Sequence, residues 1–483
     1  MEDGRSETDG ECGPSPRLLA SAPTHQQQQQ RLHHVEPAMP WRSLLIVYSV
    51  ILSDAMVVLV IMPFVPVQCR ERWHVPEEWV GSATGAILGA FSLSSFLSSF
   101  YLGHLSDHYG RKPLVCCGLL AGCLGLLSYG LSTNFYWAFA SLFLPGLVNS
   151  NVSIVRAICS DLTLPGEQRT LAMGHINACF SLSRFVSSSI GGFLVMEIAG
   201  LPLFEDNAFL LPCVLGSLAN LACFAWVAIG LEETLSRHGP QVAWDVEGAS
   251  DVGDTEETMG LWPSLAQVAR DPLLVCLMVC FAAGSFSSNG AMVALSLLYA
   301  LPAMDNGMGF GTGESGMAYA WMALAGLFFQ IFVFRKALQR LGLWRMCRAS
   351  ILLLAVCLVL LPLWSAFSAR LELGPGAHSA TVWALFLPVS ALTAACLSCS
   401  SAVLAAMQSN ACPQDKQGLV MGLNGSLGSL LRAIGPFAVG LSFVFPLAAF
   451  GLLALVLAAS LVVLSCLPAH LVWRTTAAAT SSQ

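Results

Sequence analysis

The chain has 483 residues and a net charge of −7, and 55% of its residues are hydrophobic while only 11% are charged. A soluble domain usually carries about 25% charged residues, so this composition excludes an ordinary soluble protein. The mean hydropathy of +0.68 indicates a chain that lies mainly in lipid. The small net charge points to neither a basic nor an acidic partner, and we expect no nucleic acid to bind.

Twelve apolar runs follow a polar N-terminal segment over residues 1–40, which contains the run QQQQQ and no apolar stretch. A bilayer core of about 30 Å needs about 20 helical residues, so each run is long enough for one transmembrane helix. We therefore predict an all-α membrane protein, with a disordered cytoplasmic tail over 1–40 and a second cytoplasmic tail over 469–483. The predicted helices cover residues 43–65, 80–102, 113–132, 136–158, 171–196, 207–230, 272–296, 316–335, 347–367, 380–406, 417–442 and 445–468.

Basic residues are distributed unequally between the predicted connections. If the N-terminus is cytoplasmic, the opposite side holds only Arg70, Arg72 and Arg370. Because Lys and Arg collect in cytoplasmic loops, this asymmetry predicts that both termini face the cytoplasm, in either the plasma membrane or the vacuolar membrane. The cytoplasmic connections then hold Arg111, Lys112, Arg156, Arg169, Arg237, Arg270, Arg335, Lys336, Arg340, Arg345, Arg348 and Lys416.

An acidic segment over residues 232–268 separates the sixth and seventh predicted helices. We interpret it as a cytoplasmic linker between an N-terminal six-helix bundle (41–231) and a C-terminal six-helix bundle (269–468). The two bundles resemble each other in sequence. A shift of 248 residues superposes Arg184 on Arg432, Pro165 on Pro413, Met173-Gly174 on Met421-Gly422 and Gly192 on Gly440. In addition, HYGRKP (108–113) has a degenerate counterpart in RLGLWR (340–345). Two parallel six-helix pseudo-repeats are typical of the major facilitator architecture.

The stretch GHLSDHYGRK, from Gly103 to Lys112, resembles the loop 2–3 motif of the major facilitator superfamily and lies at the expected place after the second helix. The helix 1 stretch SDAMVVLVIMPFVP is similar to the drug:proton antiporter branch. The run NACPQDKQGLVMGLNGSLGSLLRAIGP is most similar to the zinc-induced facilitator-like group and to bacterial tetracycline exporters. Three departures from those patterns are Leu142 in place of a helix 4 Arg, Ser187-Ser188 in place of the helix 5 Gly-Pro, and Cys69 alone in place of a cysteine pair.

This resemblance implies a conformational latch in the loop between helices 2 and 3. Gly103 and Gly110 allow a tight reversal, and Asp107 can meet the positive N-terminal end of helix 11. Such a latch favours one of two states, the outward-open one in this family. The alternative is a loop whose basic residues only set the topology. The predicted latch residues are Gly103, Asp107, Gly110, Arg111, Lys112 and Asp161, with Arg111 bridging the two acids.

Three charged residues lie deep inside predicted helices, and Asp54 is the one acid among them. It lies about 11 residues, or about 16 Å, into the first helix, close to the membrane midplane. A carboxylate there costs several kcal/mol unless it is neutralised or faces a wet cavity, which suits reversible proton binding. The alternative is a structural pair within the bundle.

Arg184 and Arg432 are predicted at equivalent positions of helices 5 and 11. Two arginines that face one cavity favour an anionic or zwitterionic solute, because guanidinium groups bind carboxylates with two hydrogen bonds. The alternative is a structural role between helices, and one arginine would then pair with Asp54. Asn149, Asn289 and Gln330 are further candidate solute contacts, or polar contacts that only join helices.

These patterns predict a secondary transporter that moves a small solute by alternating access, with protons and the bilayer as its other partners. No GxxxxGK[ST] phosphate loop and no catalytic motif occurs, so we expect neither an enzyme nor a cofactor. The cysteines lie almost entirely in apolar runs and form no CxxC pair, so we expect no metal site. We favour a monomeric proton-coupled antiporter; the alternatives are a facilitative uniporter and a transport-inactive receptor or scaffold.

Overall fold

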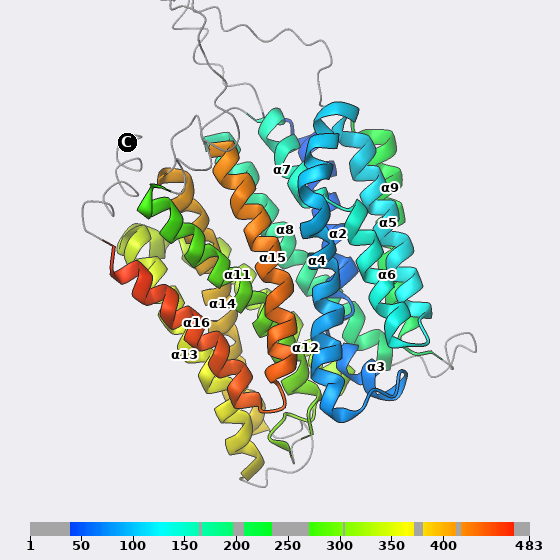
Figure 1. Cartoon of the computed structure of the whole chain (residues 1–483), viewed down its shortest axis with the longest axis vertical. Coiled ribbons are helices and arrows are strands. Elements are labelled where there is room, and N and C mark those ends of the chain that lie inside the picture. The colour runs from blue at the N-terminus through cyan, green and yellow to red at the C-terminus, as the bar shows by residue number, and fades with distance from the viewer. Residues whose placement is uncertain are drawn as a thin grey trace, which may run out of the picture. The chain divides into compact units, whose positions relative to one another are not determined.

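The computed structural model describes residues 39–163, 167–196, 207–233, 270–302, 305–370, 380–411 and 417–467. The chain divides into Met1–Pro40, nearly all of which lies outside these ranges, and Trp41–Gln483, to which the description below applies. The predicted tails and most of the predicted linker therefore fall outside the described residues. Every regular element in the described part is a helix (Figure 1).

The helices follow the chain in two groups. The first group holds α2 (Trp41–Leu59), α3 (Val65–Glu71), α4 (Glu77–Tyr109), α5 (Arg111–Leu131), α6 (Phe135–Val148), α7 (Asn151–Leu162), α8 (Glu167–Met196) and α9 (Leu210–Gly230). The second group holds α11 (Pro272–Ala300), α12 (Thr312–Phe328), the π-helix η2 (Phe329–Val333), α13 (Phe334–Arg370), α14 (Ala380–Ala411), α15 (Gln417–Ser442) and α16 (Pro446–Ser465). The two groups lie within the predicted N-terminal (41–231) and C-terminal (269–468) bundles and are called the N-terminal and C-terminal halves below.

Helix starts follow the local sequence. Asn134 accepts a hydrogen bond from the Trp137 N–H at 2.9 Å and so caps α6. Asp271 caps α11 in the same way, by accepting from the Leu273 N–H at 3.0 Å, and Pro272 follows as its first residue. Short polar residues next to apolar runs thus decide where these two helices begin.

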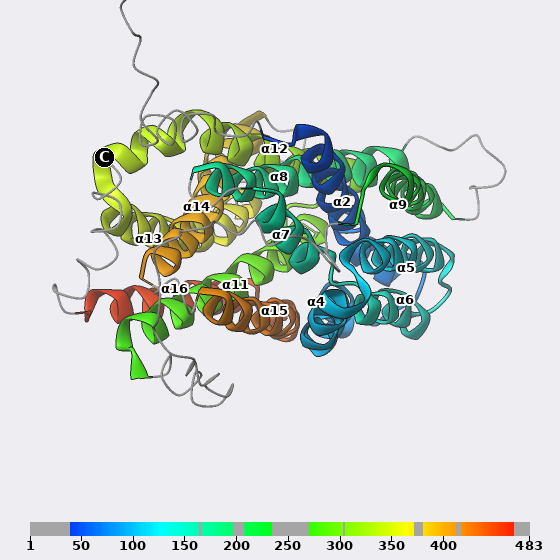
Figure 2. The ribbon, with the colours of Figure 1, turned by 90° about the horizontal axis from the view of Figure 1, so that it is seen from above.

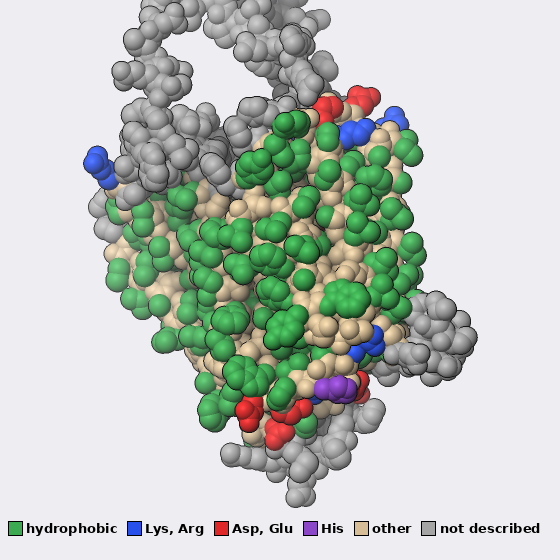
Figure 3. Space-filling view, turned by 45° about the vertical axis from the view of Figure 1, so that its right-hand side comes forward, with side chains coloured by type: hydrophobic (Ala, Val, Ile, Leu, Met, Phe, Trp, Pro, Cys, Tyr) green, Lys and Arg blue, Asp and Glu red, His purple; other side chains and the backbone are tan. Residues whose placement is uncertain are grey.

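Ten stretches of the described chain are long and apolar enough to cross a bilayer. One of them, Thr312–Phe367, contains the eighth and ninth predicted helices in succession, and α15 supplies the eleventh. The predicted twelve-helix membrane fold is confirmed. On the face shown in Figure 3, a wide apolar belt surrounds the middle and the charged side chains gather at the two ends, as lipid requires.

The expected continuous helix over 136–158 is wrong, because the chain breaks between α6 and α7. Asn149 adopts an extended conformation (φ −100°, ψ 113°), and Ser150 follows outside either helix. The Asn149 side-chain oxygen accepts a hydrogen bond from the Asn151 N–H at 3.0 Å. A short polar side chain that bonds nearby backbone competes with the helix, which explains the break at this point.

The two predicted reversals at 108–113 and 340–345 have the same backbone conformation at their glycines. Gly110 has φ +105° and ψ 155°, and Gly342 has φ +73° and ψ 163°. A positive φ is costly for residues with a β-carbon, so glycine is required at both turns. The internal repeat read from the sequence thus extends to backbone geometry.

The two halves pack tightly on the face of the bundle that carries α3, here called the α3 face. A β-carbon added to Gly81 of α4 would lie 2.6 Å from the Gly440 carbonyl oxygen of α15. Ser296 of α11 donates a hydrogen bond to the Met62 carbonyl oxygen at 2.7 Å, across the two halves. Arg70 Nη1 likewise donates to the Ala300 carbonyl oxygen at 2.9 Å. The opposite face, which carries the Gly110 reversal, is called the turn face (Figure 1).

Candidate functional site

Asp54 is the centre of a buried polar cluster in the N-terminal half. Its side chain is 5% exposed. Asn149 Nδ2 donates to Asp54 Oδ1 at 2.5 Å, and Asn151 Nδ2 donates to the same oxygen at 3.0 Å. Both amides come from the break between α6 and α7, so the broken helix supplies two neutral donors to one carboxylate. Neither Arg184 nor Arg432 forms an ion pair with Asp54 in the described part of the chain.

Neighbouring helices hold this cluster in place. Asn149 Nδ2 also lies 3.4 Å from the Gly118 carbonyl oxygen of α5. A β-carbon on Gly118 would overlap the Asn151 amide, so glycine gives that side chain its space. Asn220 of α9 donates to the Ser53 carbonyl oxygen at 3.1 Å. The position of the carboxylate therefore depends on four elements of the N-terminal half.

Several atoms of the same residues have unused hydrogen-bonding capacity. Asn151 Oδ1, Ser150 Oγ, Ser53 Oγ and Asn220 Oδ1 are buried and form no hydrogen bond with any described residue. A buried polar atom without a partner costs about 1–3 kcal/mol, so such atoms mark places where a proton, a water or a solute is accommodated. The cluster can therefore form more hydrogen bonds than its own side chains provide.

Arg432 lies on α15 and is half-buried. Its Nη2 donates to Ser429 Oγ at 2.6 Å. The positive charge of Arg156, on α7 in the other half, acts on the Arg432 guanidinium group. Arg156 had been expected in a cytoplasmic connection; it lies instead inside a candidate membrane span, because the second part of the broken helix continues to Leu162.

Arg184 lies on α8, where that helix packs against α12. It is half-buried, and its Nε forms no hydrogen bond with any described residue. The Tyr319 hydroxyl of α12 interacts electrostatically with Arg184, and it donates a hydrogen bond to the Met292 carbonyl oxygen at 2.8 Å. Arg184 therefore lies between the two halves, in a different setting from Arg432.

The other predicted solute contacts belong to the C-terminal half. Asn289 Nδ2 donates to the Ser285 carbonyl oxygen at 3.1 Å, one turn earlier in α11. Gln330 lies in the π-helix η2, is half-buried, and forms no hydrogen bond with the described residues. π-Helical turns often occur at functional sites, but hydrogen bonds do not join either amide to the Asp54 cluster.

The reversal at Gly110 is held by a residue that is not among the predicted site residues. Glu233, just after α9, accepts hydrogen bonds from the N–H groups of Arg111 at 2.9 Å and Lys112 at 3.2 Å. A carboxylate at this point caps the first turn of α5. Helical backbone is described at Gly103, Asp107 and Asp161, but their side-chain environments lie outside the described residues, so the proposed bridge from Arg111 to the two acids stays a prediction.

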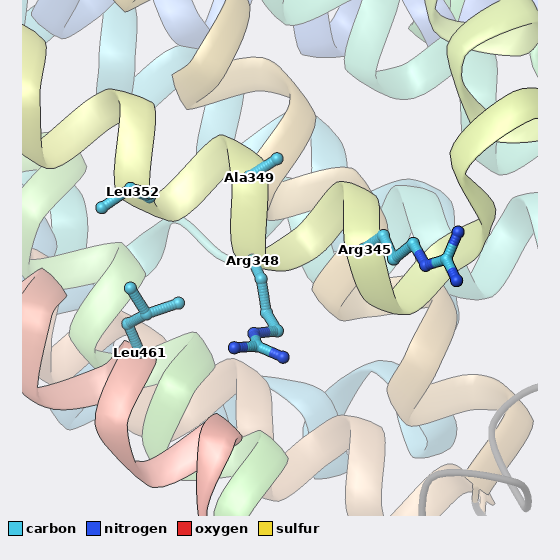
Figure 4. A pocket seen from close by; sticks show the side chains of 5 residues that line it. All are labelled: Arg345, Arg348, Ala349, Leu352 and Leu461. Atoms are coloured by element: carbon cyan, nitrogen blue, oxygen red, sulfur yellow. The ribbon is translucent and has the colours of Figure 1, made fainter.

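A surface pocket of about 280 Å³ lies between α13 and α16, on the outside of the C-terminal half (Figure 4). Arg348 extends toward α16, whereas Arg345 extends away from it. The other residues that line the pocket are Ala349, Leu352 and Leu461, so none of the predicted solute contacts lines this pocket. Among the described residues, no group of three or more His, Cys, Asp or Glu side chains could hold a metal ion.

The profile of the Major Facilitator Superfamily matches residues 44–436, which is most of the chain. This protein belongs to the major facilitator superfamily. It is therefore an integral multi-pass secondary transporter and not an enzyme, since the superfamily consists of transporters. The predicted resemblance to zinc-induced facilitators and tetracycline exporters is also confirmed by individual relatives.

Among these superfamily members, the ZINC INDUCED FACILITATOR-LIKE 1 protein of Arabidopsis thaliana is 25% identical over 437 residues, or 86% of each chain. The class H tetracycline resistance protein of Pasteurella multocida is 27% identical over 153 residues, or 32% of this chain and 38% of its own. The fold is similar to the human organic anion transporter MFSD10 (TM-score 0.60, 21% identity, 89% of this chain and 100% of that chain). It is also similar to a D-xylose–proton symporter (TM-score 0.68, 11% identity, 89% and 98%).

The structure adds three residues to the candidate site of this superfamily member. Asn151 and Asn220 complete the Asp54 cluster, and the charge of Arg156 acts on Arg432. A signal for Asn151 exists in the sequence, as part of the polar run Asn149-Ser150-Asn151 in an apolar helix. Arg156 was missed because a charge near the end of an apolar run reads as a loop residue until the length of the helix is known.

Proposed function

We propose that the protein is a proton-coupled antiporter, with Asp54 as the residue that binds and releases the proton. The main support is the Asp54 cluster: one carboxylate, buried within the membrane span, held by two neutral amides and by no basic residue among those described. A carboxylate with no basic partner can gain a proton without leaving an opposite charge behind. Asp54 is thus suited to cycling between two charge states.

Proton binding at Asp54 has a mechanical consequence for α7. The charged carboxylate binds the Asn149 and Asn151 amides by charge-assisted hydrogen bonds, which are about twice as strong as neutral ones. Protonation weakens both bonds at the point where the helix is already broken. The segment α7 is then freer to move relative to α2, so one protonation event can change the packing on the turn face.

The cycle alternates between access from the two faces. The tight glycine contacts and cross-half hydrogen bonds on the α3 face support a state that is closed there. With the turn face in the cytoplasm, and with both termini there, this state receives solute from the cytoplasm. The latch of Gly103, Asp107, Gly110, Arg111, Lys112 and Asp161 stabilises the opposite state. The protein acts as a monomer in the plasma membrane or the vacuolar membrane.

Solute binding is assigned to the space between the halves, with Arg184, Arg432, Asn149, Asn289 and Gln330 as candidate contacts. Arg184 lies where α8 meets α12, and Arg432 faces Arg156 of the other half. The two rival functions keep the same fold: a facilitative uniporter needs no proton, and a receptor or scaffold binds solute without moving it.

A solute screen in proteoliposomes, driven by a pH jump, tests the proposal. We expect the parent protein to drive solute flux from the pH gradient and the Asp54→Asn variant to lose that coupling while solute exchange continues. Glu314→Gln is the matched control, because Glu314 is a half-buried carboxylate that caps α12 on the α3 face, away from Asp54. Its pH-driven flux should be unchanged.

Each rival predicts a different result in the same vesicles. Flux that follows the solute gradient and ignores the pH gradient in the parent identifies a uniporter. Solute binding without flux identifies a receptor or scaffold. Full pH-driven flux in Asp54→Asn contradicts the role of Asp54.

A further inference from the structure

The described membrane spans contain an imbalance of charge. Away from their ends, the helices α2, α7, α8 and α15 hold three arginines, Arg156, Arg184 and Arg432, and one acid, Asp54. The acid is satisfied by amides, so it neutralises none of the three. Charged groups inside a membrane protein are normally paired or face a water-filled path, because an isolated charge there is costly. The arginines therefore require a counter-charge from elsewhere.

Arg156 and Arg432 form the most concentrated part of this imbalance. They come from α7 and α15, in opposite halves, and the charge of Arg156 acts on Arg432. Arg432 has one hydrogen bond, to Ser429, and Arg156 has no hydrogen bond or ion pair with any described residue. A guanidinium group has five N–H donors, so this pair offers many donors and two positive charges without an acceptor that matches them.

The pair lies on two helices, α7 and α15, that are not close packing neighbours in the described part of the chain. The close neighbours of α7 are α2, α5, α8 and α4, which all belong to its own half. Gly425 lies two turns before Arg432 on the same face of α15 and has no atom within 4 Å of the place where a β-carbon would be. Arg156 is solvent-exposed although it lies within a span and close to an arginine of the other half. These features place an exposed guanidinium group on α7 and open space beside Gly425 on α15, in opposite halves.

We propose that Arg156 and Arg432 bind the solute as an organic anion, through one or more carboxylate or phosphate groups that bridge the two halves. Carboxylate and phosphate oxygens match the fork of a guanidinium group and accept two hydrogen bonds from it. An anion with two charged groups neutralises both arginines at once, so dianions bind more tightly than monoanions. This inference rests on the proposed transport function, because it takes the bound anion to be the transported solute. Binding of the anion does not itself require a proton.

The position of Arg156 also links this site to Asp54. Arg156 is five residues after Asn151 on α7, or about 7.5 Å along the helix toward the turn face. The same short helix therefore carries an amide that holds Asp54 at one end and an anion-binding side chain farther on. Movement of α7 upon protonation changes the distance between Arg156 and Arg432, which provides for the exchange of a proton against an anion.

Binding to the purified full-length protein in detergent tests the inference directly. The probes are succinate, malate and citrate, with succinamide as the uncharged analogue of succinate and sodium chloride at equal ionic strength as the salt control. We expect at least one of the three acids to raise the midpoint of thermal unfolding, and succinamide and chloride to leave it unchanged. Inorganic phosphate distinguishes general oxoanion binding from a requirement for carboxylates.

Variants then locate the site. Arg156→Gln and Arg432→Gln should each weaken binding of the stabilising acid by about tenfold or more, since each removes a charge-assisted contact. Arg156→Lys should retain part of the affinity. Arg348→Gln is the matched control, because it removes an arginine of the surface pocket on α13, and it should bind as the parent does.

The outcomes separate this inference from the proposed function. Stabilisation by none of the three acids, or equal stabilisation by succinamide, overturns the anion site. Unchanged affinity in both glutamine variants also overturns it. Anion binding that depends on Arg156, together with flux that ignores the pH gradient, supports the site and contradicts the proton-coupled mechanism instead.

Discussion

The two halves share a fold but treat their buried polar groups differently. In the N-terminal half, the fourth membrane helix is broken, and its amides hold the Asp54 carboxylate. In the C-terminal half, the corresponding helix α14 is continuous, although Pro388 lies inside it. There Gln408 and Asn424 bind each other, with Asn424 Nδ2 donating to Gln408 Oε1 at 2.7 Å. Charge and a helix break occur together in one half, whereas neutral amides and a continuous helix occur together in the other.

This difference indicates that the buried polar groups of the two halves have different roles. The amide pair between α14 and α15 satisfies itself, and Gln408 Nε2 also donates to the Leu277 carbonyl oxygen of α11 at 3.0 Å. Such a network holds three helices together and has no group that titrates near neutral pH. The Asp54 cluster has the opposite properties, namely an acid, unpaired polar atoms and a break in the helix that supplies its amides. We expect proton coupling to depend on the first half and rigidity on the second.

The largest effect is expected from making the N-terminal half resemble the C-terminal one. The double variant Asn149→Ala/Ser150→Ala removes the side chain that competes with the helix and favours a continuous α6–α7 helix. Transport in proteoliposomes should fall by about tenfold or more, because α7 can no longer move independently and Asp54 loses a donor. The thermal midpoint should stay within a few degrees of the parent value, which distinguishes lost motion from misfolding.

The reverse perturbation, in the C-terminal half, should affect stability and not coupling. Gln408→Leu leaves the Asn424 amide buried without its partner, which costs about 1–3 kcal/mol of stability. We expect a lower thermal midpoint and the same dependence of flux on pH. The double variant Gln408→Leu/Asn424→Leu should recover part of the loss, since it removes both polar groups. A change in the pH dependence would show that the amide pair takes part in coupling.

The two equivalent reversals allow a smaller and more exact comparison. Alanine at Gly342 must adopt φ near +73° and ψ near 163°, a conformation found almost only in glycine that costs about 1–3 kcal/mol, but the space around it is open. Alanine at Gly110 has the same strain and in addition comes within 2.5 Å of Glu233 Oε2, so it displaces the cap of α5. Thermal unfolding should therefore show a larger loss for Gly110→Ala than for Gly342→Ala. Equal losses would mean that Glu233 contributes little.

The smallest effect concerns Cys69, which the sequence places in a loop but the structure buries completely, next to Thr84. Burial raises the pKa of the Cys69 thiol to about 12, so at pH 7.5 it is protonated and reacts poorly with maleimides. We expect peptide mapping to find Cys69 unlabelled in the folded protein and labelled in denaturant. The exposed Cys466 serves as the reactive comparison. Rapid labelling of Cys69 at pH 7.5 would contradict the burial of α3 against α4.

Sequence reasoning succeeded where a property belongs to a whole segment. The existence of twelve helices follows from the length of the apolar runs, and the repeat follows from the matched positions of Gly110 and Gly342 and of Arg184 and Arg432. It identified Asp54 because a carboxylate in the middle of an apolar run is visible at once. It did not predict the break after Val148, since one hydrogen bond between Asn149 and Asn151 decided it against an otherwise helical sequence.

The sequence by itself therefore determined that this chain is a twelve-helix membrane transporter of the major facilitator superfamily. The physical reason is that lipid leaves backbone polar groups no other partner than their own helix, so hydropathy and length suffice. Only the tertiary structure decided which polar side chains meet. Asp54 reaches amides 95 and 97 residues away, and the charge of Arg156 in one half acts on Arg432 in the other. Such encounters depend on how each helix is rotated against its neighbours, and apolar composition does not specify that rotation.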